Sequence, residues 1–328
     1  MTRLEKTRVD NSPTSTALRN GFCLMGINNS PIMSSASQSD PTSGNILRSL
    51  PFVVVDGVMN MRTVGGYPAA AYAAGTQVTP LHVFRSGDLS RITELGQTQL
   101  RALGITTVFD LRSEAEIARY GSTTPGIEGV RVVRAPAMTD AAWHAADLEA
   151  LLRKYQENEI ATFVEEYEDR LKTAGLAFKT IFTHLRDRPS EPCLVFDTAG
   201  KDRTGLFAAV LLLLLGASDA DIVKDYALTT QGLAPYADML AERFKAVPVF
   251  RDNWEGFLKM GSSREEPMAA TLAMIRAKFG GAEGYLKTVK WCTRHRQRGS
   301  GRKSNVLHYS IAVQGELQEY TSQVRVYE

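Results

Sequence analysis

The residues most able to do chemistry lie together in segment 195–205, which reads VFDTAGKDRTG. Arg203 offers a planar fork of donors, and Lys201 adds a second positive charge. The apolar run 193–196 is typical of a buried strand, 198–201 of a tight turn, and 203 onward of an apolar helix. Because N–H groups at a helix N-terminus lack partners and carry the positive end of the dipole, this order predicts an anion site.

The spacing Asp197-x5-Arg203, with Gly200 and Gly205, favours anion binding over a merely capping or surface role for Arg203. The predicted ligand-binding residues are Thr198, Ala199, Gly200, Lys201, Asp202, Arg203 and Thr204. For two of these residues, Lys201 and Thr204, a role without ligand binding is also open. A loop lysine such as Lys201 is often solvated, and the Thr204 hydroxyl at a helix start can satisfy its own backbone.

The candidate catalytic residues are Asp197, Arg203, Asp110 and Asp202. Asp197 follows the strand directly, where the helix dipole and Arg203 would favour its negative charge. Asp202 either donates a proton or caps the helix, and capping is the commoner role at a helix start. Asp110 ends the predicted strand 105–111, and it either approaches the loop or ties the strand end to Arg112.

This segment resembles the loop of the tyrosine phosphatase-like proteins of bacteria and fungi, which have the dual-specificity phosphatase fold. That family carries His-Cys-x-x-Gly-Lys-Asp-Arg-Thr-Gly, whereas this chain has Phe196 and Asp197 in place of the His and the Cys. In the family, the cysteine thiolate attacks phosphorus and the histidine helps to set its environment. Aspartate keeps a negative charge but lacks the nucleophilicity of a thiolate.

Further segments are similar to motifs of that family, in the family's order: 60–67 (NMRTVGGY), 84–87 (FRSG), 108–113 (VFDLRS) and 279–286 (FGGAEGYL). The resemblance implies an α/β fold of the dual-specificity or tyrosine phosphatase type. A central sheet would be flanked by helices, with the phosphate loop between a strand and a helix.

Local patterns predict the surrounding elements. Ser113 and Glu116 form the pattern of a capping box for a short helix. Apolar periodicity predicts helices over 93–103, 147–185, 219–230, 235–244 and 265–279, and strands over 105–111 and 130–134. Strands and helices therefore alternate around the loop, as in an α/β domain with its site at the carboxyl ends of strands.

Composition predicts a disordered leader over 1–48. The resemblance implies a phosphatase-like domain over 49–289, and the basic tail over 290–328 diverges from the family and is expected to lie outside the core fold. The tail is either a patch for an anionic partner or a solvated end, and the second interpretation is favoured. Cys292 and Arg298 match Cys-x5-Arg there, but without the strand, loop glycines and helix of a phosphate loop.

Composition and hydropathy give no indication of nucleic-acid binding or of a membrane span. A net charge of +2 gives no argument for nucleic acid. The apolar run 206–215 has about half of the ~20 residues that a membrane span needs, so it predicts a core helix. Three scattered cysteines suit a reducing compartment, and we expect a cytoplasmic protein with no cofactor. Beyond Asp110, Asp197 and Asp202, no His or carboxylate cluster shows metal-ligand spacing.

Three functions fit these residues. The first, which we expect, is a pseudophosphatase that binds a phosphorylated or carboxylated ligand, either a small molecule or a phosphoprotein. The second is an enzyme of a secondary-metabolite pathway with Asp197 as general acid or base beside Lys201, Asp202, Arg203 and Asp110. The third is residual phosphoric monoester hydrolysis with Asp197 as nucleophile. Cysteine-dependent tyrosine phosphatase activity is not expected.

Overall fold

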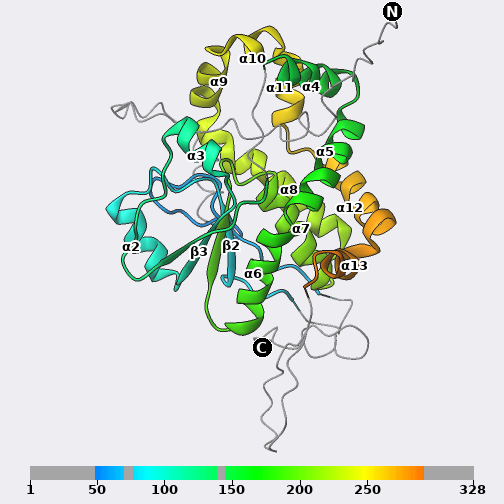
Figure 1. Ribbon diagram of the computed structural model, residues 1–328. Helices are drawn as coiled ribbons and strands as arrows, with labels where there is room; N and C mark the ends of the chain where they lie inside the picture. Colours follow the sequence, from blue (N-terminus) through cyan, green and yellow to red (C-terminus); the bar gives the residue numbers. More distant parts are fainter. Residues whose placement is uncertain (1–48, 70–76, 139–144, 292–328) are drawn as a thin grey trace, which may run out of the picture.

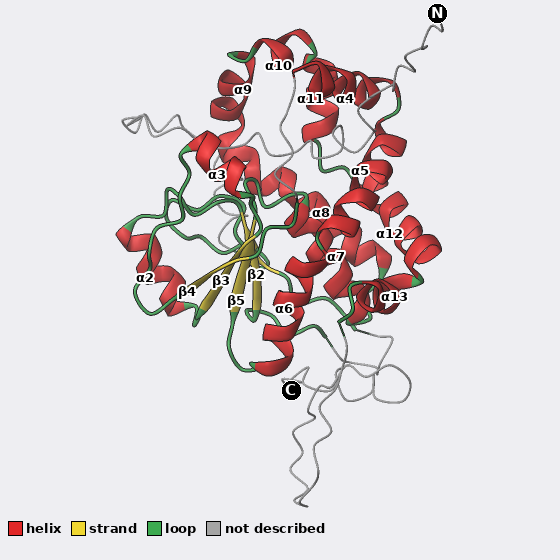
Figure 2. Ribbon diagram, viewed as in Figure 1, coloured by secondary structure: helices red, strands yellow, loops and turns green. Residues whose placement is uncertain are grey.

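The computed structural model describes residues 49–69, 77–138 and 145–291 (Figure 1). The predicted leader and the chain beyond 291 lie outside these ranges. Within them, the strands form one sheet in the order β1-β2-β5-β3-β4 (Figure 2). The strands are β1 Arg62–Thr63, β2 Val83–Ser86, β3 Thr107–Asp110, β4 Arg131–Arg134 and β5 Cys193–Phe196. β1 is antiparallel to β2, and all other pairs are parallel.

Helices flank the sheet, with α2 on one side and α6 and α7 on the other (Figure 2). In chain order the helices are α2 Glu94–Ala102, α3 Glu114–Tyr120, α4 Ala145–Glu157, α5 Glu159–Thr173, α6 Gly175–Asp187, α7 Arg203–Leu214, α8 Asp219–Leu233, the 3-10 turn η2 Ala234–Tyr236, α9 Ala237–Lys245, α10 Pro248–Asp252, α11 Trp254–Gly261, α12 Glu265–Phe279 and α13 Gly281–Thr288. The predicted α/β architecture, a central sheet flanked by helices, is confirmed.

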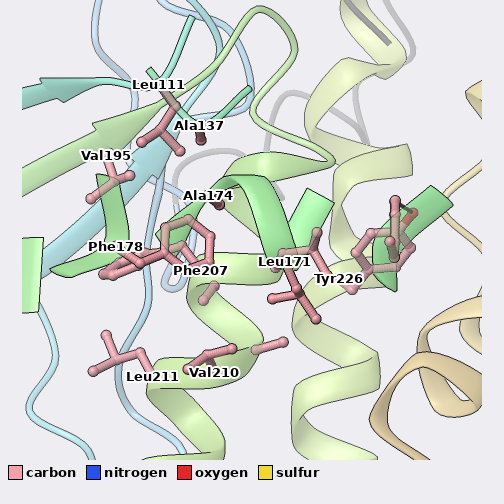
Figure 3. Close-up of a cluster of buried hydrophobic side chains, with 14 of the residues drawn as sticks. Leu111, Ala137, Leu171, Ala174, Phe178, Val195, Phe207, Val210, Leu211 and Tyr226 are labelled. Atoms are coloured by element: carbon pink, nitrogen blue, oxygen red, sulfur yellow. Dashed lines mark hydrogen bonds between the residues drawn. The ribbon is translucent and has the colours of Figure 1, made fainter. Parts of the chain in front are cut away.

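The central strand β5 supplies both faces of the core. Its side chains alternate, so Val195 joins the larger apolar cluster and Leu194 and Phe196 join the smaller one on the opposite face. In the larger cluster, Val195 faces Phe178 of α6 and Phe207 of α7 (Figure 3). This double burial fixes β5 in the middle of the sheet and therefore fixes the loop that follows it.

Helix α7 is the buried core helix that the apolar run predicted. Each of its residues except Leu213 is buried, and no face of it is polar. Its start is held by the turn after β5, and its far end stops at Gly216, whose φ is +72°. Among the described helices, none is both long enough and apolar enough to cross a membrane.

Other predicted elements differ from the structure in their boundaries. The helical stretch 147–185 is three helices, because the chain leaves helical geometry at Asn158 and turns between α5 and α6 at Ala174. The capping box is confirmed, since the Ser113 side chain accepts from the Glu116 N–H and Glu116 accepts from the Ser113 N–H. Helices α10, α11 and α13 were not predicted, because short helices give little periodic signal.

The core continues past residue 289, the end predicted for the domain. Trp291 is 4% exposed, and its ring centroid lies 5.8 Å from that of Phe182 on α6. The backbone N–H of Trp291 donates to the Leu286 carbonyl at 3.1 Å. The prediction that the chain from 290 onward lies outside the core is therefore wrong for Trp291. The basic residues that follow Trp291 in the sequence gave no sign of this apolar contact, because its partner Phe182 lies on a helix distant in sequence.

We expect a chain shortened to end at Trp291 to unfold at the same temperature as the full chain, and one ending at Lys290 to unfold earlier. Removing the Trp291 ring from its contact with Phe182 should cost about 3 kcal/mol. Thermal unfolding followed by circular dichroism would measure both, with full-length Trp291→Ala as the matched variant. Equal melting of the two shortened chains would contradict the assignment of Trp291 to the core.

Candidate functional site

The loop 197–202 joins β5 to α7 at the carboxyl edge of the sheet. Strand register places Phe196 beside Ser86 of β2 and Asp110 of β3, so the segments after these three strands meet there. Gly200 has a φ of +68°, and a Cβ on it would lie 2.3 Å from the Ser86 carbonyl carbon. Only glycine fits this turn, because a side chain is excluded by both backbone conformation and space.

The carbonyl groups of the loop point outward and are held by side chains from other elements. The Asn60 side-chain amide donates to the Ala199 carbonyl at 2.9 Å, and Arg85 Nη2 donates to the Gly200 carbonyl at 2.7 Å. A peptide whose carbonyl points one way directs its N–H the other way. The loop amides are therefore free to converge on a single point on its inner side.

That point is occupied by the carboxylate of Asp197. Its Oδ1 accepts from the N–H groups of Gly200 at 2.5 Å and Ala199 at 3.2 Å. Its Oδ2 accepts from Arg203 at 2.9 Å and Thr204 at 3.3 Å, both at the start of α7. The side chain is almost fully buried. The predicted anion site thus contains a negative charge that belongs to the loop itself.

Arg203 does not point freely into the site, because a second carboxylate holds it. Its Nη1 and Nη2 donate to the two oxygens of Glu116 at 2.7 and 2.9 Å, and its Nε lies 3.6 Å from Asp197 Oδ2. The Thr198 hydroxyl also donates to Glu116. Both charges of the pair are buried. Glu116 thus joins the capping box of α3 to the loop, a role that the sequence pattern did not indicate.

Asp202 faces away from the converging amides. Its Oδ1 accepts from the Tyr167 hydroxyl at 2.5 Å and lies 3.8 Å from Arg170 Nη1, both on α5. Asp202 occupies the first position before α7, but its side chain makes no capping hydrogen bond. The capping role favoured from sequence is therefore wrong. Tyr167 and Arg170 compete successfully for the carboxylate.

Lys201 is fully buried and its amine contacts the end of α11. Nζ donates to the carbonyls of Met260 at 2.7 Å and Ser262 at 2.9 Å, and it lies 3.4 Å from Asp202 Oδ1. Burial lowers the pKa of the amine, and the charge of Asp202 opposes this. The lysine neutralises carbonyls at a helix C-terminus, where a cation is favourable. Its charge is directed to the helices and away from the ring of loop amides.

Asp110 ties the end of β3 to two arginines. Its oxygens accept from the Arg112 guanidinium at 2.9 and 2.8 Å and from the Thr124 hydroxyl at 3.0 Å, and Arg134 forms an ion pair with the carboxylate. Burial alone would raise the pKa of Asp110, but the hydrogen bonds and charge of Arg112 and the charge of Arg134 outweigh it and lower the pKa. Of the two roles open from sequence, the structure shows the tie to Arg112.

Thr204 joins the site through its backbone N–H alone. Its side chain is fully buried, and within the part of the chain that the structure describes its hydroxyl has no hydrogen-bond partner. The predicted site residues therefore separate into two groups. Ala199, Gly200, Arg203 and Thr204 donate to the Asp197 carboxylate, and Thr198 donates to Glu116, the partner of Arg203. Lys201, Asp202 and Asp110 are directed elsewhere.

Asp225 of α8 is the residue most clearly missed from sequence. It is 1% exposed and binds Arg85 Nη1 at 2.5 Å and Arg62 Nε at 3.5 Å. Arg85 in turn holds the loop, and Arg62 Nη1 donates to the Asn60 side-chain oxygen at 2.5 Å. A single aspartate in a helix resembles a surface residue, so nothing in its local sequence marks it. Among the described residues, no group of three or more His, Cys, Asp or Glu side chains is arranged to hold a metal ion.

Comparison with known proteins identifies the family of this chain. The chain matches the sequence model of the tyrosine phosphatase family over residues 53–298. It is 30% identical to the tyrosine-protein phosphatase of Nostoc commune over 230 residues, 68% of this chain and 75% of that protein. It is also 30% identical over 255 residues to the triple specificity protein phosphatase PtpB of Mycobacterium tuberculosis, 68% of this chain and 92% of PtpB.

Among solved structures, P. aeruginosa TpbA is matched at 16% identity over 66% of this chain and 91% of TpbA. The TM-score is 0.29, so the assignment depends on the sequence matches. The family match over residues 53–298 covers most of the described residues, including the loop and the elements that hold it. This chain belongs to the tyrosine phosphatase family.

Proposed function

We propose that this protein is a pseudophosphatase, a member of the family that binds without hydrolysing. One observation carries the proposal: the Asp197 carboxylate accepts from four backbone amides of the loop. Asp197 stands at the position of the cysteine in the family's loop pattern. The anion that such a loop stabilises is therefore supplied here by a side chain that is a poor nucleophile.

The remaining thiol of the described chain offers no substitute nucleophile. Cys193 is the first residue of β5 and has no exposed surface. Burial raises the pKa of its thiol to about 12, so the reactive thiolate form is disfavoured at neutral pH. Its side chain belongs to the larger apolar cluster, and this cysteine is a packing residue.

We propose a phosphorylated or carboxylated ligand, either a small molecule or a phosphoprotein, as the partner of the loop. Such a ligand presents the same kind of oxygen anion that the loop amides already bind. Because Asp197 occupies those donors and Glu116 pairs with Arg203, the ligand must compete with two internal carboxylates. Competition of this kind weakens binding and leaves it sensitive to any change that moves Asp197.

The two enzymatic alternatives have less support. A general acid or base must reach a substrate proton, yet both oxygens of Asp197 accept from backbone amides and its side chain is 3% exposed. Asp202 is held by Tyr167, and Asp110 is held by arginines. An attack on phosphorus by Asp197 would need the same carboxylate to leave its four donors.

We expect the purified protein to show no cysteine-dependent hydrolysis of para-nitrophenyl phosphate. Asp197→Cys should gain measurable turnover, because the four amides that hold the carboxylate would stabilise a thiolate. Asp197→Ser is the matched control and should stay inactive, since a hydroxyl is not ionised there. Release of para-nitrophenol would be followed by absorbance. Wild-type turnover that iodoacetamide abolishes would contradict the proposal.

Removing the internal carboxylate should open the loop to external anions. Asp197→Ala frees four N–H donors and removes a like charge, so sulfate affinity should rise by about fivefold or more, equivalent to about 1 kcal/mol. Titration calorimetry with sulfate would measure this for the wild type and the variant.

Asp202→Asn is the matched control for that experiment. It removes a buried negative charge from the opposite face of the loop without freeing the converging amides, because Asp202 accepts from Tyr167 instead. Its sulfate affinity should stay close to that of the wild type. Equal gains in both variants would show a general charge effect, and no gain in either would show that the loop is not an anion site.

A further inference from the structure

Arg170 of α5 lies between two buried carboxylates. Its Nη2 is 3.2 Å from Glu166 Oε2, one helical turn earlier, and its Nη1 is 3.8 Å from Asp202 Oδ1 in the loop. All three side chains are 6% exposed or less. The Arg170 guanidinium therefore forms ion pairs with two carboxylates, and because all three groups are buried, water screens these interactions little.

The same carboxylate of Asp202 continues the contact into another helix. Lys201 Nζ lies 3.4 Å from Asp202 and donates to the Met260 and Ser262 carbonyls at the end of α11. Ionic contacts therefore run in sequence from Glu166 through Arg170, Asp202 and Lys201 to α11. With each group in its usual charged form, two cations balance two anions in this chain of contacts.

Glu166 is the member most easily changed by proton binding. Burial raises the pKa of its carboxyl to about 7, and Arg170 opposes this only in part. Lys278 of α12, a helix that packs on α5, pairs with Glu168 instead. The ionisable groups that face Glu166 are Lys154 and Tyr155 of α4 and Glu165, Asp169 and Arg170 of α5.

We propose that Glu166 is a proton-sensitive control on the anchoring of the loop, acting through Arg170, which it shares with Asp202. When Glu166 is protonated, it no longer attracts Arg170 as an anion, and the ionic contact between Arg170 and Asp202 holds the loop firmly on α5. When Glu166 is ionised, it competes for Arg170 and weakens that hold. This regulation lies outside the anion site and goes beyond the proposed pseudophosphatase role.

The stability of the fold should depend on whether Glu166 is protonated. Because the pKa of Glu166 is raised in the folded state, the folded protein binds this proton more tightly than the unfolded chain does, and the associated stability is lost as the pH rises through about 7. Relative to Glu166→Gln, the wild type should therefore melt at progressively lower temperature between about pH 5 and about pH 8.

Hydrogen–deuterium exchange of the peptide that covers the loop tests the coupling. After correction for the intrinsic effect of pH, we expect loop exchange in the wild type to quicken by about threefold or more between about pH 6 and about pH 8. Glu166→Gln should remove this change, since a neutral side chain cannot compete for Arg170. Glu165→Gln, an exposed neighbour that pairs with Lys154, should retain it.

Loop exchange that ignores pH in the wild type, or that keeps its pH dependence in Glu166→Gln, would overturn the proposal. Should Glu166→Gln fail to melt cooperatively, Glu166→Met supplies the same uncharged state with an apolar side chain of similar length. Sulfate binding by Asp197→Ala tests the pseudophosphatase role separately, because it depends on the opposite face of the loop.

Discussion

The site depends on one buried carboxylate, Asp225, that binds two arginines beneath the loop. Arg85 and Arg62 approach it from neighbouring strands, and their remaining donors reach the Gly200 carbonyl and the Asn60 side chain. Breaking a buried pair by removing one partner typically costs about 3–5 kcal/mol, because a charge is left without compensation. The arginines are therefore fixed, and so are the loop carbonyls that they and Asn60 hold. Because these carbonyls are held on the outer side of the loop, its amide N–H groups are directed to the inner side, where they bind Asp197.

Four amides that converge on one point create a positive potential that must be balanced. A phosphate or sulfate could supply the charge, but this chain supplies it with Asp197. Glu116 balances Arg203 in the same way, through two hydrogen bonds to the guanidinium. The loop is thus electrostatically complete without a ligand. This completeness is the physical basis for proposing a binding role of modest affinity over phosphate hydrolysis.

The inner face of the loop binds a carboxylate, and the outer face attaches the loop to neighbouring helices. The inner face presents amides to a carboxylate, while Lys201 and Asp202 turn outward and attach the loop to α11 and α5. Adjacent residues in a tight turn project in different directions, so one short segment can be both an anion site and an anchor. The proposed effect of Glu166 acts only on the anchoring face. It would change the mobility of the loop without changing the donors that surround Asp197.

The sequence by itself determined the strand, turn and helix around the loop, because apolar runs, Gly200 and the capping box Ser113 to Glu116 are local signals. It also determined the family, through motifs spread along the chain. Only the tertiary structure decided where Lys201, Asp202 and Asp110 point, what Asp225 binds and that Trp291 is buried. Their partners lie on distant elements, and a charged side chain takes the direction in which its burial is best compensated. Which partners compensate a buried charge depends on the packing of the whole molecule, so the residues next to it in the sequence do not indicate them.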